Sequence, residues 1–420
     1  MSAALEVWMD ANFLPVQQRV GTLHNDKGQV RFAYAQAWLQ SPFVFNLDPD
    51  LSLDKAPFFP RPEAGNFGVF LDSSPDRWGQ TLMQRREALE AKDQARRAKT
   101  LYAWDYLIGV QDATRQGAFR FKLEGTDIFL DDHKMAAPPL SSLQELQSVA
   151  QQLTSKKIDD LDALRRWLAV LVAPGASLGG ARPKANFTQS DGSLWIAKFP
   201  ARDDDRDIGA WEGVAHSLAV AAGIEVPPAK TLRFSKDFHT FCVQRFDRQA
   251  GRRVFYASAM TMLKKTESAG ASYLDIAQFI QRNGVPAHIK ADLAQLFKRV
   301  VFNVATGNRD DHLRNHGFVL SAQGWRLAPA FDVNPSIHNA DHVLCIDDQD
   351  NRPNLQTVLA TAAFYGLQAS VAKSMIDKAV GVVAGWKSKA RLAGLSAVDV
   401  LQTEAAFSAL DTWTQDIVGR

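Results

Sequence analysis

One short segment late in the chain carries residue types that suit phosphoryl transfer. It reads Gly-Asn-Arg-Asp-Asp-His-Leu-Arg-Asn over residues 307–315 and follows an amphipathic helical pattern through Leu296 and Val300. Asp310 and Asn315 are five residues apart, the offset between the base Asp and the magnesium-binding Asn of kinase catalytic loops. A loop this short allows the carboxylate to face an incoming hydroxyl while the amide oxygen turns toward a metal ion. The His-Arg pair of that motif is not found before Asp310, so the segment matches half of the pattern.

A further acidic residue follows this segment after a predicted hairpin. Apolar residues 318–320 and 325–327 predict two paired strands, and a Phe-Asp-Val sequence places Asp332 shortly after them. An Asp in this position is a second magnesium ligand in kinases. The alternative interpretation of Asp332 is a helix or turn cap before Asn334.

A lysine in an apolar strand is the next candidate. Residues 194–198 read Leu-Trp-Ile-Ala-Lys, which predicts a strand that ends at Lys198. A buried ammonium without a partner is destabilising, so we expect a partner for it. Glu212 lies on a helix predicted for residues 208–222 and would supply it, as a Glu does for the phosphate-binding lysine of kinases. A lysine on a solvent-facing strand edge is the alternative.

Two loops flank this strand. Residues 177–186 read Ser-Leu-Gly-Gly-Ala-Arg-Pro-Lys-Ala-Asn, and glycines let backbone N–H groups approach phosphate oxygens closely. The loop is neither a Walker A motif nor Gly-x-Gly-x-x-Gly, but its place ahead of the lysine strand favours a phosphate-covering role. Residues 243–248 end another predicted strand and would suit the hinge whose backbone reads adenine.

The remaining periodicities predict a mixed protein. Alternating residues at 5–9 and 30–34 predict half-buried strands, and Ser74 is the predicted cap of a helix that runs through Arg86. A short Pro- and Ser-bearing segment at 135–143 predicts a domain boundary. Further helices are predicted at 143–153 and 158–172, and after Tyr273 the pattern is mostly helical. Further strands are predicted near Phe187, at 231–234 and at 240–245.

Composition narrows the class of protein. With 420 residues, two or three domains are expected at about 150 residues each. The hydrophobic fraction of 46%, the charged fraction of 22% and a net charge of +2 are typical of a soluble globular protein and give no overall signal for nucleic-acid binding. The two cysteines have no metal-binding spacing, and no apolar run approaches the roughly 20 residues of a membrane helix. We expect a cytoplasmic protein without a membrane partner.

Together the ordered segments resemble the HipA family of toxin kinases. Residues 177–184 resemble the family's Ser-x-Gly-Gly-Ala-x-x-Lys loop, and residues 310–315 resemble its Asp-x-His-x-x-Asn loop. The hinge, the Phe-Asp-Val sequence and two N-terminal segments also fit, so the resemblance covers nearly the whole chain. It implies an α+β, protein-kinase-like bilobal fold with an N-terminal α+β accessory subdomain. The implied parts are the accessory subdomain, a small lobe with the glycine-rich loop, and a helical lobe, at residues 1–140, 141–248 and 249–420.

The resemblance also implies a role for each site residue. Asp310 would be the catalytic base, Asn315 and Asp332 would hold Mg²⁺, and His312 would lie near the γ-phosphate of ATP. The residues implied to bind ATP come from the glycine-rich loop, the lysine strand, the following helix and the hinge: Ser177, Gly179, Gly180, Ala181, Lys184, Lys198, Glu212, Gln244 and Phe246. Ser177 resembles the family's autophosphorylation site, where about −1.5 to −2 added charges would oppose phosphate binding.

The implied partners follow from the same family. A small helix-turn-helix antitoxin, HipB-like, would neutralise the toxin, and the chain would reach DNA only through that antitoxin. The implied substrate is a protein, with aminoacyl-tRNA synthetases among the known family substrates.

Three other interpretations compete with a protein kinase. A metal-dependent hydrolase would use acidic and histidine side chains that suit zinc or manganese, but it leaves Lys198 and the glycine-rich loop unexplained. Its ligands would come from Asp310, Asp311, His312, His316, Asp332, His338 and His342. A small-molecule kinase would share the same core. A pseudokinase that only partners an antitoxin would have the same sequence features.

Overall fold

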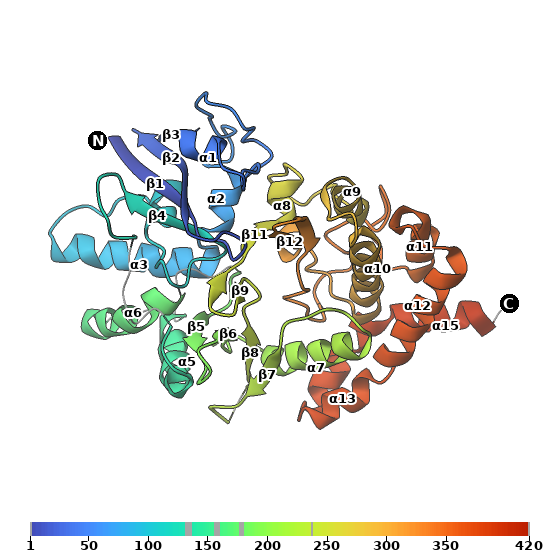
Figure 1. Ribbon diagram of the computed structural model, residues 1–420. Coiled ribbons are helices and arrows are strands. Elements are labelled where there is room, and N and C mark those ends of the chain that lie inside the picture. Colours follow the sequence, from blue (N-terminus) through green and yellow to red (C-terminus); the bar gives the residue numbers. More distant parts are fainter. Residues whose placement is uncertain (1, 131–136, 155–159, 176–179, 237, 419–420) are drawn as a thin grey trace. The chain divides into compact units, whose positions relative to one another are not determined.

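The computed structural model describes residues 2–130, 137–154, 160–175, 180–236 and 238–418. These residues form an α+β protein with two compact units (Figure 1). The first unit contains residues 1–203 and 242–257, and the second contains residues 204–241 and 258–420. The chain therefore enters the second unit, returns to the first and enters the second again. The predicted division at residues 140 and 248 stays a prediction.

An antiparallel sheet begins the first unit. Its strands lie in the order β3-β2-β1-β4, with β1 at Ser2–Met9, β2 at Gln18–Asp26, β3 at Gln29–Tyr34 and β4 at Phe119–Leu123. Leu5 of β1 is opposite Leu23 on one side and Leu123 on the other. Leu5, Val7 and Met9 are fully buried. The period-two alternation of the sequence therefore correctly predicted strands with one buried face.

The helices of the first unit connect this sheet to the next. They are α1 (Gln36–Leu39), α2 (Gly68–Asp72), α3 (Arg77–Asp93), α4 (Ala103–Ile108), a short 3₁₀ turn (Leu140–Ser142), α5 (Leu143–Leu153) and α6 (Leu161–Gly175). The predicted cap at Ser74 is wrong. Asp76 caps α3 by accepting a hydrogen bond from the N–H of Arg77, whereas the Ser74 hydroxyl donates to the carbonyl of Phe70 at the end of α2.

The second sheet carries the predicted lysine strand. Strands β5 (Lys184–Thr188) and β6 (Leu194–Lys198) are antiparallel neighbours, and their register puts Lys184 directly opposite Lys198. Strand β8 (Thr240–Gln244) is the next neighbour of β6, followed by β7 (Ala229–Leu232). The strand predicted at 231–234 begins and ends two residues earlier. Short strands follow: β9 (Arg248–Gln249), β10 (Arg252–Arg253) and β11 (Phe255–Ser258).

The second unit is mostly helical, as predicted for the chain after Tyr273. Its helices are α7 (Ile208–Ala221), α8 (Ala259–Met262), α9 (Tyr273–Asn283), α10 (Ile289–Thr306), α11 (Leu355–Ala360), α12 (Ala369–Val383), α13 (Trp386–Leu392), α14 (Ala397–Thr403) and α15 (Ala409–Val418). Strands β12 (Gly317–Ser321) and β13 (Gly324–Leu327) form the predicted hairpin. Helix α10 packs against α9, α11, α12 and α15 (Figure 1). No helix among the described residues is both long and apolar enough to cross a membrane.

Helix α7 is anchored in this helical core. Trp211 is fully buried, and its ring lies 6.0 Å from that of Trp386 and 6.3 Å from that of Phe407. Asp207 caps the helix by accepting from the N–H of Ala210. Burial of large aromatic side chains stabilises a contact strongly, so α7 holds Glu212 in a fixed place within the second unit.

Candidate active site

The end of helix α10 places the predicted catalytic loop. Gly307 terminates the helix with a left-handed backbone, φ +63°, a conformation in which glycine is the default residue. A Cβ atom at Gly307 would lie only 2.2 Å from the carbonyl oxygen of Ala406. Glycine is therefore required at residue 307 for two reasons. One is the left-handed backbone angle, and the other is the close approach of the chain at Ala406.

The loop brings Asp310 and Asn315 together as the spacing predicted. The side-chain amide nitrogen of Asn315 donates to the backbone carbonyl of Asp310 over 2.7 Å. This bond points the amide nitrogen toward the Asp310 carbonyl, so the amide oxygen of Asn315 points away from that carbonyl. The Asp310 side chain is 70% exposed, and Nε2 of His312 lies 3.9 Å from its Oδ1. Asp310 is therefore accessible to a substrate, with a histidine beside it.

The neighbouring carboxylate, Asp311, is buried. It accepts hydrogen bonds from the hydroxyl of Tyr273, from Nδ1 of His342 at 3.0 Å and from the N–H of Val343 at 2.8 Å. Burial alone would raise the pKa of Asp311, but the hydrogen bonds from these groups outweigh it and lower that pKa. Asp311 is therefore a buried, ionised anchor of the loop.

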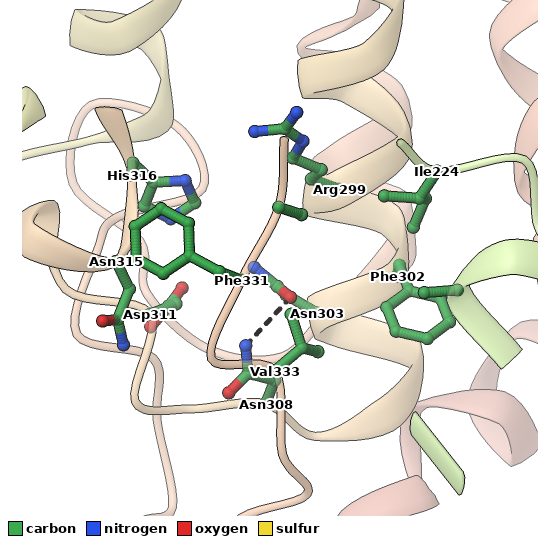
Figure 2. A pocket seen from close by; sticks show the side chains of 12 residues that line it. Ile224, Arg299, Phe302, Asn303, Asn308, Asp311, Asn315, His316, Phe331 and Val333 are labelled. Atoms are coloured by element: carbon green, nitrogen blue, oxygen red, sulfur yellow. Dashed lines mark hydrogen bonds between the residues drawn. The ribbon is translucent and has the colours of Figure 1, made fainter. Parts of the chain in front are cut away.

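A small pocket lies between this loop and α10 (Figure 2). Asp311, Asn315 and His316 line it from the loop, and Asn303 lines it from the helix. Asn308 donates to the side-chain oxygen of Asn303 over 3.0 Å, the bond drawn in Figure 2. Burial lowers the pKa of His316 to about 4, so its ring is neutral at pH 7. Asn315 is thus part of a pocket lined by both polar and apolar side chains.

The segment after β13 contributes the other side of this pocket. Phe331 and Val333 line the pocket, and Asp332 stands between them with a left-handed backbone, φ +57°. Among non-glycine residues Asp and Asn adopt this conformation most readily. Two hydrogen bonds fix the segment: the N–H of Ser336 donates to the carbonyl of Gly307 over 2.8 Å, and Arg206 donates to the carbonyl of Pro335 over 3.0 Å. Asp332 is therefore held in the same unit as the catalytic loop.

The first unit holds the predicted phosphate-binding lysines. Lys184 and Lys198 are directly opposite on β5 and β6, so their side chains leave the same face of the sheet. Gly180 has φ +74°, and a Cβ atom there would lie 2.5 Å from Nζ of Lys184. The glycine therefore lets the chain pass close to this ammonium. Ala181 is exposed, and the predicted site residues Ser177 and Gly179 lie outside the described residues.

A buried ionic network fixes the predicted hinge. Arg245, between Gln244 and Phe246, donates to the carboxylate of Asp247 and to the side-chain oxygen of Asn186 at 2.8 Å. Asp247 also accepts from the N–H of Gly117 at 2.8 Å. The hinge is thus bound to the sheet and to residues near β4. Adenine recognition by Gln244 and Phe246 stays a prediction, as does the ion pair of Lys198 in the first unit with Glu212 in the second.

Sequence reasoning missed three residues of the site. Arg309 does precede Asp310, so only the His of the kinase His-Arg pair is replaced. Its guanidinium donates to the carbonyl of Asn339 over 2.7 Å. Tyr273 and His342 reach Asp311 from 38 and 31 residues away. The Arg-Asp pair could have been read from the sequence, whereas the two distant donors had no local signal.

The metal-hydrolase interpretation depends on a cluster of acidic and histidine side chains. No group of three or more His, Cys, Asp or Glu side chains in the described part of the chain could hold a metal ion by itself. Two of its proposed ligands, Asp311 and His342, are hydrogen-bonded to each other. The assignment of Asn315 and Asp332 as magnesium ligands stays a prediction.

The sheet with its paired lysines and the helical unit with its Asp-Asn loop define a protein of the kinase-like class. Comparison with known families gives the same result: the HipA-like C-terminal domain matches residues 176–386, and the HipA N-terminal domain matches residues 5–103. The chain therefore belongs to the HipA family.

Individual relatives agree with this assignment. The chain is 24% identical over 364 residues to the Sinorhizobium fredii protein named "Putative kinase Y4mE", covering 80% of this chain and 78% of that protein. It is 25% identical over 190 residues to the serine/threonine-protein kinase toxin HipA of Shewanella oneidensis, covering 38% of this chain and 43% of the toxin. The role of each site residue stays a prediction.

A solved structure confirms the fold. The Shewanella oneidensis toxin–antitoxin complex of HipA, HipB and operator DNA contains a chain that matches 97% of this protein and 95% of its own length, with a TM-score of 0.66 and 17% identity. The α+β, kinase-like bilobal fold with an N-terminal subdomain is therefore correct.

Proposed function

We propose that this protein is an ATP- and Mg²⁺-dependent serine/threonine protein kinase that acts in the cytoplasm as the toxin of a toxin–antitoxin pair. The observation that carries the proposal is the loop of residues 310–315. It presents an exposed carboxylate and, through the 2.7 Å hydrogen bond of Asn315 to the Asp310 carbonyl, an amide with a defined orientation. Phosphoryl transfer depends mainly on positioning and electrostatics, and this loop supplies both.

Asp310 would orient the attacking hydroxyl and accept its proton. Its exposure suits a serine or threonine delivered by another protein, since a protein side chain reaches the carboxylate from solvent. His312, next to Asp310, would lie near the γ-phosphate. Asp310 and His312 would both act from one short loop, so the end of α10 determines where they lie.

The residues present fit Mg²⁺. Asn315 and Asp332 offer amide and carboxylate oxygens, and magnesium is usually bound by one or two carboxylates together with substrate phosphates and water. When bound, the ion neutralises charge on the phosphates. The left-handed backbone at Asp332 and the hydrogen bond of Ser336 to Gly307 fix the main chain around this residue.

The two opposite lysines support phosphate binding. Residues directly opposite each other on two antiparallel strands send their side chains to the same face of the sheet. Lys184 and Lys198 occupy such positions, and the chain at Gly180 passes close to the Lys184 ammonium. ATP phosphates would lie against this face, covered by residues 177–184, while the hinge with Gln244 and Phe246 would bind adenine.

The partners are inferred from the relatives. The Shewanella oneidensis complex contains HipA with HipB and operator DNA. We therefore infer a HipB-like helix-turn-helix antitoxin for this chain, with DNA bound through the antitoxin. The proposed substrate is a protein of translation, with an aminoacyl-tRNA synthetase as the first candidate. Ser177 is the proposed site of autophosphorylation.

The test is phosphoryl transfer by the purified full-length chain with labelled ATP, with and without Mg²⁺. Transfer to a protein acceptor or to Ser177, located by mass spectrometry and absent in Asp310→Asn, supports the proposal. Transfer only to small molecules assigns the protein to the small-molecule kinases. Binding of ATP and antitoxin without any transfer identifies a pseudokinase. An absence of ATP binding refutes the proposal.

A further inference from the structure

The chain segment that follows Asp332 is attached to the catalytic loop at three successive points. Ser336 donates to the carbonyl of Gly307, and Arg309 donates to the carbonyl of Asn339 over 2.7 Å. The third point is Asp311, which accepts from His342 and from the N–H of Val343. Residues 307–311 and residues 336–343 therefore lie side by side, and both segments run in the same direction along these contacts.

Asp311 is the strongest of these attachments. Its side chain and that of His342 have no solvent exposure. One carboxylate oxygen, Oδ2, accepts from both His342 and Tyr273, and the other accepts from Val343. Hydrogen bonds to a charged group in a buried site are stronger than neutral ones. Asparagine at this position would remove the charge and replace one of the two acceptor oxygens by an NH₂ donor, so the set of three hydrogen bonds could not be kept.

The donors to Asp311 come from two parts of the unit. Tyr273 is the first residue of α9, and Asn303 of α10 donates to its hydroxyl over 2.8 Å. His342 and Val343 belong to the segment after Asp332. The carboxylate thus connects two helices, the catalytic loop and that segment, one residue from Asp310.

We propose that Asp311 is a positioning residue for phosphoryl transfer: it clamps residues 336–343 to the catalytic loop and so holds Asp310, Asn315 and Asp332 in one arrangement. This inference rests on the proposed function. In many kinases a phosphate added to the segment after the second magnesium ligand orders that segment by pairing with an arginine. Here a carboxylate built into the chain does so, and Arg309 binds a backbone carbonyl.

The second unit contains a matched control. Asp292, on α10, is also buried and also accepts three hydrogen bonds: two from Arg326 at 2.9 Å each and one from the N–H of Leu327 at 3.1 Å. It contacts β13 and has no bond to the catalytic loop among those described. Asp311→Asn and Asp292→Asn therefore remove the same charge from two buried side chains, 0% and 5% exposed, and only Asp311 belongs to the clamp.

The experiment compares wild type, Asp311→Asn, Asp292→Asn and Tyr273→Phe as full-length proteins. Steady-state kinetics with ATP and a protein acceptor give kcat and KM for the folded fraction. Hydrogen–deuterium exchange of the peptide spanning residues 339–345 reports on the clamp without any need for activity. Tyr273→Phe removes one neutral donor and keeps the carboxylate, so it remains informative if Asp311→Asn does not fold.

In Asp311→Asn, kcat is expected to fall by roughly 10- to 100-fold, because small displacements of reacting groups have effects of that size. KM for ATP should change by a smaller factor than kcat, since the lysines and the hinge proposed to bind ATP lie outside the clamp. Tyr273→Phe should show a smaller fall in kcat in the same direction. Exchange at residues 339–345 should accelerate in both variants but not in Asp292→Asn, which should retain the wild-type kcat.

Equal kcat in Asp311→Asn and Asp292→Asn, or unchanged exchange at 339–345 in both clamp variants, overturns the inference. If the wild-type chain transfers no phosphate to any acceptor, the proposed function fails. The exchange data then decide separately whether Asp311 clamps the segment.

Discussion

The side-chain amide of Asn315 and the backbone carbonyl of Asp310 are joined by a hydrogen bond of 2.7 Å. This bond closes the loop between the two residues on which the proposed chemistry depends. It ties the Asn315 side chain to the main chain of Asp310, so a change at Asn315 alters the setting of Asp310.

Replacing the proposed base should abolish transfer without preventing ATP binding. Asp310→Asn keeps the size of the side chain and removes its ability to accept a proton. Loss of a general base typically lowers the rate by about 10²- to 10⁴-fold. Single-turnover rates and ATP affinity measure the two effects separately. Asp348→Asn, at an exposed carboxylate of the same unit, is the control and should behave as wild type. A wild-type rate in Asp310→Asn would remove this residue from the mechanism.

Asp332→Asn tests the proposed metal ligand without disturbing the backbone. Asn tolerates the left-handed conformation observed at residue 332, whereas alanine would add strain. The half-saturating Mg²⁺ concentration should rise by more than the roughly tenfold typical of changes behind a ligand. Activity measured as a function of Mg²⁺ concentration gives this value. Asp341→Asn removes an exposed charge from the same segment and should leave the Mg²⁺ curve where it is.

The paired lysines predict additive losses of ATP affinity. Lys184→Met and Lys198→Met each remove one ammonium from the same face of the sheet. A hydrogen bond to a charged group contributes about 1.5 to 3 kcal/mol, so each variant should bind ATP roughly 10- to 100-fold more weakly. Fluorescence or calorimetric titration measures the dissociation constants. Lys290→Met, at an exposed position on α10, provides the comparison. Unchanged affinity in Lys198→Met would place the phosphates elsewhere.

The hinge network should be important for stability. Arg245 and Asp247 have almost no solvent exposure, 3% and 4%, and Arg245 donates to several chain segments. Breaking one side of a buried pair costs about 3 to 5 kcal/mol, so Arg245→Met should lower the free energy of unfolding by roughly that amount. Arg352→Met breaks an exposed pair with Asp350 and should cost less than about 1 kcal/mol. Urea unfolding of both variants decides whether burial sets the difference.

A buried carboxylate in the first unit predicts a pH effect. Burial raises the pKa of Asp48 from 3.8 to about 6. The folded protein therefore binds this proton more tightly than the unfolded chain, so the contribution of Asp48 to stability falls as the pH rises from 3.8 to 6. At pH 7 the buried charge costs roughly 3 kcal/mol. Asp48→Asn should therefore gain stability relative to wild type between pH 4 and pH 7 in thermal unfolding. Parallel pH profiles would show that Asp48 ionises normally.

Much of the site could be predicted because its signals are local. The strand at residues 194–198, the helix that begins at Ile208 and the hairpin at residues 317–327 follow from apolar periodicity over a few residues. The turn at Gly307 and the five-residue offset of Asp310 and Asn315 are likewise properties of a short stretch of chain. Local geometry depends on neighbouring residues, so these features were present in the sequence alone.

The capping residue of α3 was harder to predict from the sequence. Ser74 and Asp76 are both good capping residues, and the choice between them depends on where α2 ends. The prediction for the strand at Ala229–Leu232 was two residues too late in the chain for a related reason. The ends of this strand are set by its sheet neighbour rather than by its own apolar pattern.

What the sequence determined by itself is the set of reactive residues and their order: a glycine-rich loop, a lysine strand, an Asp-Asn loop and a later Asp. The tertiary structure decided which of two adjacent carboxylates is exposed and which is buried. Asp310 and Asp311 are chemically identical, but only Asp311 meets Tyr273, His342 and Val343. Those donors come from distant segments that are brought together by packing around α10, because burial and hydrogen bonding over long sequence separations depend on the whole fold.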